Sequence, residues 1–372
     1  MAKRFYIIPI FAPHLGCPNR CIFCNQRRTA STYQIPNAGT VRKIIESHLD
    51  TIPMQGDIRV EVAFYGGSFT ALPEKQREEL LTAASSYVEE GLITGIRVST
   101  RPDVVDQGIL EQLKKHKVSV IELGVQSMDD EVLAAAGRGH TSRDVIFASR
   151  LIKQYGFRLG HHIMLGLPGD SCDKTLETAR KVLALKPDLV RIHPTLVIRD
   201  TELEKRYRQG IYQPLSLEEA VARCKELVIL FERFGVEVIR IGLQPTPTLN
   251  LEGDVVAGPF HPALGELVYA AVAYEQLAAL TTAYLAGREV ERKKIKIYCH
   301  PRDLSVVTGQ AKRNIIKLRK EFDIGEVEVK PEERLSRGTF GISGGNLFRP
   351  EMLLNRQEFV NKYRIKIKSE TK

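Results

Sequence analysis

The chain has 372 residues, of which 43% are hydrophobic and 27% are charged. This is the composition of an ordinary folded protein, and the length suits one large domain with a smaller one. No apolar run reaches the roughly 20 residues that span a bilayer, so no membrane partner is expected. The apolar start at 5–11 lacks a cleavage site of small residues, and we interpret it as a first strand of a cytoplasmic protein.

The excess of positive charge is confined to the last fifth of the chain. Residues 291–372 hold 20 Lys and Arg against 11 Asp and Glu, whereas residues 1–290 hold 34 of each kind. A basic module that faces a polyanion such as RNA is one explanation. An ordinary solvated basic surface is the other.

Short apolar and β-branched runs alternate with amphipathic helical segments, such as 73–91 and 173–187, through most of the chain. This alternation predicts an α/β fold with a parallel sheet, either an open doubly wound sheet or a barrel. In both folds, ligands bind at the carboxyl ends of the strands, where the segments YGGS, STRPD, GVQS and LGLPGD fall. The predicted strands are 5–11, 59–67, 95–102, 119–127, 157–168, 189–197 and 237–243.

A segment with four prolines and no clear period, 244–262, suggests a boundary. We therefore predict a core at 1–250, a helical linker at 251–290, and a basic α+β domain at 291–372. In the last part the sequence predicts a strand at 293–301, a helix at 304–322, a strand at 326–333 and a glycine-rich turn at 338–346.

Half of the six cysteines lie close together, with Cys17, Cys21 and Cys24 in the spacing C-x3-C-x2-C. Four thiolates would indicate structural zinc, whereas three leave one iron of a 4Fe–4S cluster open to another ligand. A zinc site completed by His14 is the alternative. The other cysteines, Cys172, Cys224 and Cys299, lie in separate segments, so we expect ordinary thiols and a single cluster.

The cysteine spacing, with Phe23 before the last cysteine, resembles the signature of the radical S-adenosylmethionine (SAM) superfamily. The resemblance implies a partial (β/α)6 TIM-type barrel and a 4Fe–4S cluster held by Cys17, Cys21 and Cys24. It also implies that SAM binds the open iron as cofactor. Reductive cleavage of SAM then gives a 5′-deoxyadenosyl radical, and the electron comes from a flavodoxin or ferredoxin type donor.

Further motifs resemble the subgroup of the Elongator catalytic subunit and, more distantly, oxygen-independent coproporphyrinogen oxidase. They are YGGSFT (65–70), STRPD (99–103), ELGVQS (122–127), HHIMLGLPG (161–169) and HPTLVIRDTEL (193–203). Ser99 and His162 stand where relatives have acidic residues. By this resemblance the SAM contacts are Phe23, Gly66, Gly67, Ser99, Gln126, Arg138 and His162. Near other strand ends, Arg101, Asp103, His193 and Arg199 serve either to orient the substrate or to form salt bridges.

Elongator-like proteins modify the wobble uridine of transfer RNA (tRNA) and carry an acetyltransferase domain. No glycine-rich acetyl-CoA loop is recognisable in this sequence, so we expect a member of the subgroup without that domain. The basic C-terminal unit is similar to small RNA-binding folds. Its predicted helix presents Arg313, Lys317 and Lys320 on one face, with Lys312 and Arg319 beside them.

The first hypothesis is therefore a radical SAM enzyme that acts on RNA, specifically tRNA, and binds it through this basic cluster. A second hypothesis keeps the enzyme class but gives it a small anionic metabolite such as a porphyrinogen. A third is a non-enzymatic, metal-containing protein that binds nucleic acid.

Overall fold

A computed structural model describes residues 5–366 except 13–16, 18–20, 30–35, 54–57, 244–248, 287–293 and 345–346. The chain divides into two compact units. The first unit comprises Met1–Ser216, Gly242–Phe260 and Ser369–Lys372, and the second comprises Leu217–Ile241 and His261–Lys368.

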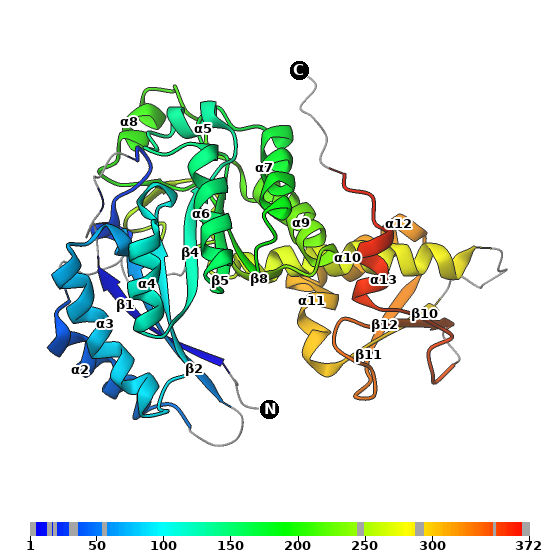
Figure 1. The fold of residues 1–372 in the computed structure, drawn as a ribbon. Coiled ribbons are helices and arrows are strands. Elements are labelled where there is room, and N and C mark those ends of the chain that lie inside the picture. Colours follow the sequence, from blue (N-terminus) through cyan, green and yellow to red (C-terminus); the bar gives the residue numbers. More distant parts are fainter. Residues whose placement is uncertain are drawn as a thin grey trace. The chain divides into compact units, whose positions relative to one another are not determined.

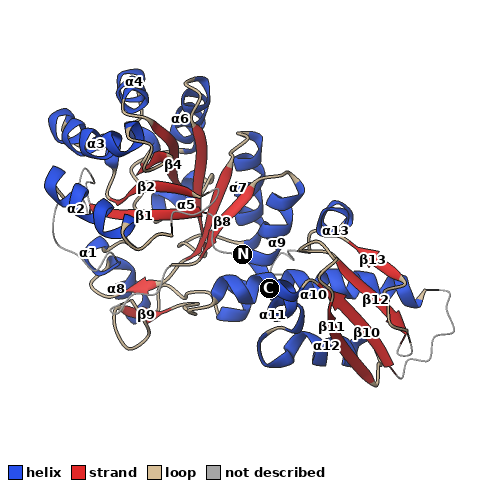
Figure 2. Ribbon diagram, turned by 90° about the horizontal axis from the view of Figure 1, so that it is seen from below, coloured by secondary structure: helices blue, strands red, loops and turns tan. Residues whose placement is uncertain are grey.

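A curved parallel sheet forms the centre of the first unit (Figures 1 and 2). Its strand order is β1-β2-β3-β4-β5-β6-β8, and every pair from β1–β2 to β5–β6 is parallel. This arrangement confirms the predicted α/β fold with a partial barrel. The strands from the first unit are β1 (Phe5–Ala12), β2 (Arg59–Gly66), β3 (Gly95–Thr100), β4 (Val118–Gln126), β5 (Arg158–Leu165) and β6 (Leu189–Pro194). The last strand in the order, β8 (Glu237–Ile241), comes from the residues of the second unit.

Helices connect these strands and lie along the outer face of the sheet (Figure 2). Several begin at a side chain that accepts a hydrogen bond from a first-turn N–H, as Asp106, Thr141 and Ser171 do. The helices are α1 (Gln26–Thr29), α2 (Ala38–Leu49), α3 (Glu74–Glu89), α4 (Gln107–Lys115), α5 (Asp130–Ala135), α6 (Ser142–Gln154), α7 (Cys172–Ala184) and α8 (Glu202–Arg208). A small antiparallel pair, β7 (Val197–Ile198) and β9 (Val255–Ala257), also belongs to this unit.

The two faces of the sheet differ in chemistry because successive side chains on a strand alternate between them. On β2, Val62 and Phe64 are buried against the helices, whereas Glu61 and Tyr65 lie on the inner face. His161 of β5 points to the helix side, where its Nε2 is 2.9 Å from the hydroxyl of Ser149 on α6. The inner face is therefore the polar face, and the candidate site lies on it.

The second unit has a four-stranded sheet in the order β11-β10-β12-β13. β10 pairs with β11 in parallel and with β12 antiparallel. The strands are β10 (Lys294–Cys299), β11 (Glu326–Pro331), β12 (Phe340–Gly344) and β13 (Met352–Leu354). The helices are α9 (Leu217–Arg233), α10 (Leu264–Leu285), α11 (Leu304–Thr308), α12 (Arg313–Phe322) and α13 (Arg356–Lys362).

Helix α10 packs into the core of this second unit. Its Tyr274, Leu277 and Leu280 share a buried cluster with Ile297 of β10 and Phe340 of β12. The segment 251–290, predicted as a linker, thus supplies the helix that covers the C-terminal sheet. The two compact units accordingly differ from the predicted division at residues 250 and 290.

Two local predictions in the C-terminal part were wrong. The helix expected at 304–322 is broken, because Gly309, Ala311 and Lys312 have φ values of 68°, 52° and 60°. The glycine-rich turn expected at 338–346 contains β12, since pairing with β10 outweighs the turn preference of glycine. Among the described helices, none combines the length and hydropathy that crossing a bilayer requires.

Candidate active site

The segment that carries the three cysteines follows β1 and is fixed by its own backbone. The N–H of Ile22 donates to the carbonyl of Ala136 (3.1 Å), and the carbonyl of Ile22 accepts from the N–H of Leu203 (2.8 Å). Phe23 packs against a buried cluster that contains Val132 and Ala136. Phe23, predicted as a cofactor contact, therefore also anchors this segment in the fold.

The three thiols lie within electrostatic reach of one another. Burial, followed by the negative charges of Cys21 and Cys17, raises the pKa of Cys24 to about 12, while Arg138 opposes this rise. The Nη1 of Arg138 donates to the Sγ of Cys21 (3.1 Å). Three thiolates here repel each other unless a cation neutralises them, which is the chemistry of a thiolate-bound metal cluster.

A closed metal shell is not formed by the residues that the structure describes. Among them, no three His, Cys, Asp or Glu side chains are grouped closely enough to hold a metal ion. His14, the alternative zinc ligand, lies outside the described residues, as do 13–16 and 18–20 on either side of Cys17. Three cysteine thiolates are suitable ligands for an iron–sulfur cluster. To bind one, the sulfur atoms of Cys17, Cys21 and Cys24 would have to move closer together than they are in this structure.

The glycine pair after β2 lies directly against the end of β1. Gly66 has a φ of 105°, and a Cβ there would lie 3.1 Å from the carbonyl carbon and oxygen of Ala12. The N–H of Gly67 donates to the same carbonyl at 2.8 Å. Position 66 therefore requires glycine, and the turn holds the end of β2 against the end of β1.

Gln126 and Arg138, both predicted as SAM contacts from the family resemblance, lie next to Gly124. A Cβ on Gly124 would lie 3.1 Å from Gln126 Nε2 and 3.4 Å from Arg138 Nη2, and the latter atom donates to the carbonyl of Gly124 at 2.8 Å. The buried Oε1 of Gln126 and Nε of Arg138 have no hydrogen-bond partner among the described residues. Buried polar atoms are rarely left unpaired, so these two mark where a ligand would bind.

His162 lies on the same inner face, beside His193. Their rings are 4.2 Å apart in an edge-to-face arrangement. Burial, and then the charge of Arg191, lowers the pKa of His162 to about 3. His162 is therefore neutral at physiological pH, and its Nε2 has no partner among the described residues. It offers a hydrogen bond to a ligand and no charge.

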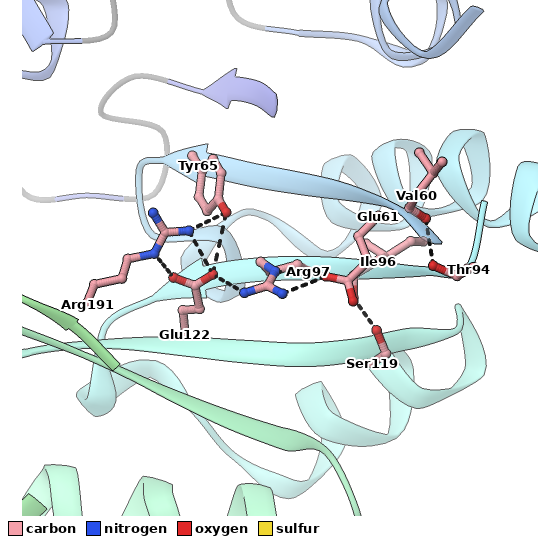
Figure 3. Close-up of polar contacts among 9 residues, drawn as sticks. All are labelled: Val60, Glu61, Tyr65, Thr94, Ile96, Arg97, Ser119, Glu122 and Arg191. Carbon is pink, nitrogen blue, oxygen red and sulfur yellow. Dashed lines mark hydrogen bonds and ion pairs between the residues drawn. The ribbon is translucent and has the colours of Figure 1, made fainter. Parts of the chain in front are cut away.

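A buried network of charges runs across the inner face from β2 to β6 (Figure 3). Arg97 donates to Glu61 at 3.0 and 2.6 Å and to Glu122 at 2.8 Å. Arg191 donates to Glu122 (3.2 Å from Nη2) and to the hydroxyl of Tyr65. The network is neutral in sum, because two arginines meet two glutamates.

The ionisation of this network is fixed by its pairing. Burial alone would raise the pKa of Glu122, but Arg191 and then Arg97 hold it below the usual range. Burial raises the pKa of Tyr65 to about 12, so its hydroxyl stays protonated. Ser99, a predicted SAM contact, lies opposite Glu122 in the β3–β4 register and is partly exposed.

Sequence reasoning did not identify this network as a unit. Its signal was the recurrence of polar residues at alternate positions of strands whose other face is apolar, as in Glu61 and Tyr65. The alternation of polar and apolar residues shows which side chains share one face of the sheet. Which charged residues pair with each other depends on the register between the strands.

Two other residues predicted near strand ends, Arg101 and Arg199, form polar contacts within the described part of the chain. Arg101 pairs with Asp103 at 2.9 and 2.7 Å, and Arg199 donates to the carbonyl of Gly253 at 3.1 Å. Burial raises the pKa of Cys299 to about 12 and that of Cys224 further still. Cys172 is buried as well.

The predicted RNA-binding residues lie in the second unit, on and before α12. A pocket of about 570 Å³ there is lined by Gln310, Ala311, Arg313, Ile316, Lys317 and Lys320. Lys312 and Arg319 are not among its lining residues. The structure thus groups Arg313, Lys317 and Lys320 around one cavity, on the face that helical spacing predicts.

Residues 12–182 match the radical SAM superfamily, and residues 187–273 match its C-terminal domain. The chain belongs to the radical SAM superfamily. The membership confirms the family predicted from the cysteine spacing, and the chain is accordingly a radical SAM enzyme.

Several relatives share this core. An uncharacterized protein of Methanocaldococcus jannaschii is 30% identical over 260 residues, which is 66% of this chain and 80% of that protein. The tRNA uridine(34) acetyltransferase of the same organism is 33% identical over 175 residues, which is 46% of this chain and 31% of the enzyme. Human Elongator complex protein 3 is 32% identical over 193 residues, covering 46% and 35%. The chain thus matches about a third of the length of these two named relatives.

The fold is also similar to the solved structure of the archaeal Methanocaldococcus infernus Elp3 with an N-terminal deletion. The TM-score is 0.58 at 22% identity, and the match covers 79% of this chain and 66% of the other. This similarity supports the fold.

Proposed function

We propose that this chain reductively cleaves SAM at a 4Fe–4S cluster and uses the resulting radical to modify tRNA. Cys17, Cys21 and Cys24 would hold the cluster. When bound, the cluster and SAM supply a 5′-deoxyadenosyl radical, with the electron from a flavodoxin or ferredoxin type donor. The observation that carries this proposal is the contact of Arg138 with Cys21, together with the buried Oε1 of Gln126, which has no partner in the described part of the chain.

The chain's own residues would bind and orient the cofactor. Gly66 and Gly67 hold the end of β2 against the end of β1, after which the cysteine segment follows in the sequence. One side-chain atom each of Gln126, Arg138 and His162 has no partner among the described residues and would be available to a polar ligand. Ser99 completes this set from β3, and Phe23 fixes the cysteine segment. Because His162 is neutral, it would donate or accept a hydrogen bond where relatives have a carboxylate.

RNA as substrate is supported by the names of the relatives and by charge. The matched core of this chain is shared with a tRNA uridine(34) acetyltransferase. The positive excess lies at 291–372, and the cluster of Lys312, Arg313, Lys317, Arg319 and Lys320 would contact the phosphate backbone. Elongator-type acetyl transfer is not part of the proposal.

The proposal is tested by nucleoside analysis of tRNA from a strain that lacks this gene. One modified nucleoside is expected to disappear, and the wild-type protein, but not Cys21→Ala, is expected to restore it. Unchanged tRNA together with an accumulated anionic metabolite would overturn the RNA substrate and support the small-molecule alternative.

A further inference from the structure

The pocket beside α12 is shaped by a turn that interrupts the helical segment. Gly309 has a φ of 68°, and Ala311 and Lys312 are left-handed. The carboxamide of Asn314 fixes this turn by donating to the carbonyls of Ala270 (2.8 Å) and Val306 (2.9 Å). The turn is therefore held in place by the core of the unit, and its residues Gln310 and Ala311 line one side of the pocket.

Three of the six residues that line the pocket are positively charged. Arg313, Lys317 and Lys320 make no ion pair with an acidic side chain in the described part of the chain. Lys317 Nζ lies 3.8 Å from the centre of the Tyr274 ring, and the Tyr274 hydroxyl donates to Glu321. This cation–π contact orients Lys317 and leaves its charge to attract an anion.

The same pocket has an apolar side chain in its lining, Ile316. Ile316 is 60% exposed, and it follows Arg313 by one helical turn and precedes Lys320 by another. A single exposed isoleucine is unremarkable on its own. In a pocket that is also lined by three cations, however, Ile316 offers an apolar surface for a flat group, and the cations beside it can bind an anion.

That combination fits a nucleotide, which has a planar base and a charged phosphate. The volume of about 570 Å³ lies within the range of small-molecule sites. A base enters such a pocket only when it is unpaired and unstacked, as in a single-stranded loop. A rigid duplex would present phosphates to the cations but no base to Ile316.

We propose that this pocket binds one unstacked nucleotide of a single-stranded RNA segment. Its phosphate lies against Arg313, Lys317 and Lys320, and its base packs on Ile316. That the bound polyanion is RNA rests on the proposed function. The new element is that the enzyme selects a single-stranded region of it.

The test compares binding of a labelled single-stranded RNA 12-mer and of the same sequence as a blunt duplex, by fluorescence anisotropy over a salt series. The full-length protein is expected to prefer the single strand. Ile316→Ser is expected to weaken single-strand binding about fivefold to tenfold, with the salt slope and duplex binding unchanged. The matched control is Leu353→Ser, which alters an isoleucine-sized side chain, 50% exposed on β13, outside the pocket lining.

The cations are tested in the same series. Replacing Arg313, Lys317 and Lys320 by Gln is expected to lower the salt slope for the single strand by about 0.7, because the three cations share one phosphate and one phosphate contact on a single strand contributes about 0.7. Lys312→Gln with Arg319→Gln should weaken both RNA forms alike and keep the single-strand preference. Circular dichroism melting verifies that each variant is folded.

Equal affinity for the two RNA forms would overturn the inference, as would an Ile316→Ser effect no larger than that of Leu353→Ser. The proposed function fails separately. If tRNA nucleosides are unchanged in the deletion strain but single-strand binding depends on Ile316, the pocket stands and the substrate assignment falls. If tRNA is modified and Ile316→Ser binds normally, the opposite holds.

Discussion

Replacing Arg97 by Met tests the buried network of the inner face. Arg97 is 2% exposed and links Glu61 with Glu122 through three hydrogen bonds. Arg97→Met keeps most of the volume but leaves Glu61 without a cation, while Glu122 keeps Arg191. Removing one partner of a buried ion pair costs about 3–5 kcal/mol. For a unit of this size the melting temperature should fall by roughly 6–20 °C.

The assay is thermal and urea unfolding of the full-length protein, followed by circular dichroism. The double variant Glu61→Gln/Arg97→Met should recover part of the loss, because the uncompensated carboxylate is gone. Lys115→Met is the control, since it breaks a largely exposed pair with Glu78 and should change stability little. If Arg97→Met lowered the melting temperature no more than Lys115→Met, or if the double variant were no better than the single one, the reasoning would be refuted.

Three further predictions concern single residues. Burial lowers the pKa of His161 to about 3, so the stability that this neutral histidine contributes is complete above its unfolded pKa near 6.5 and is lost as the pH falls toward 3. In urea unfolding at pH 7 and pH 5, this group should lower the free energy of unfolding by at most about 1.4 kcal/mol per pH unit. His161→Gln should reduce that pH dependence. Gly66→Ala should destabilise the fold by about 1 kcal/mol or more and weaken SAM binding in calorimetry, because it adds a close contact with Ala12 to the strain of a positive φ. The control is Gly91→Ala, where φ is 73° but no atom lies within 4 Å of the added Cβ. It should destabilise the fold less and leave SAM binding intact. Arg138→Lys keeps the charge but loses the two-pronged contact, so 5′-deoxyadenosine should form more slowly at unchanged iron content, and an unchanged rate would show that only the charge matters.

The barrel was predictable because its signals are local. Alternating runs such as Val60, Val62 and Phe64 mark strands, and amphipathic segments mark the helices between them. The clustering of Cys17, Cys21 and Cys24 and the glycine pair at Gly66 are also visible in a single stretch of sequence. The partners in the buried network could not be predicted, because they depend on which residues the register sets opposite each other.

The C-terminal unit was harder because its structure is decided by tertiary contacts. Helix α10 is apolar on all sides, which indicates a buried helix and not a linker, and this signal was available. The break after Gly309 had no such signal in the sequence, because the helical spacing of apolar residues continues through it. The residue that anchors the turn, Asn314, donates to the carbonyl of Ala270, which is far away in the sequence. Phe340 and Ile342 alternate as strand residues do, but the glycines around them favour a turn.

The central claim is tested most directly by iron and sulfide analysis after anaerobic reconstitution, combined with measurement of 5′-deoxyadenosine after reduction with SAM. The wild-type protein is expected to hold about four irons and four sulfides per chain and to release 5′-deoxyadenosine. The triple variant Cys17→Ala/Cys21→Ala/Cys24→Ala is expected to do neither. A protein with a full cluster that forms no 5′-deoxyadenosine, or a triple variant that retains the iron, would contradict the account.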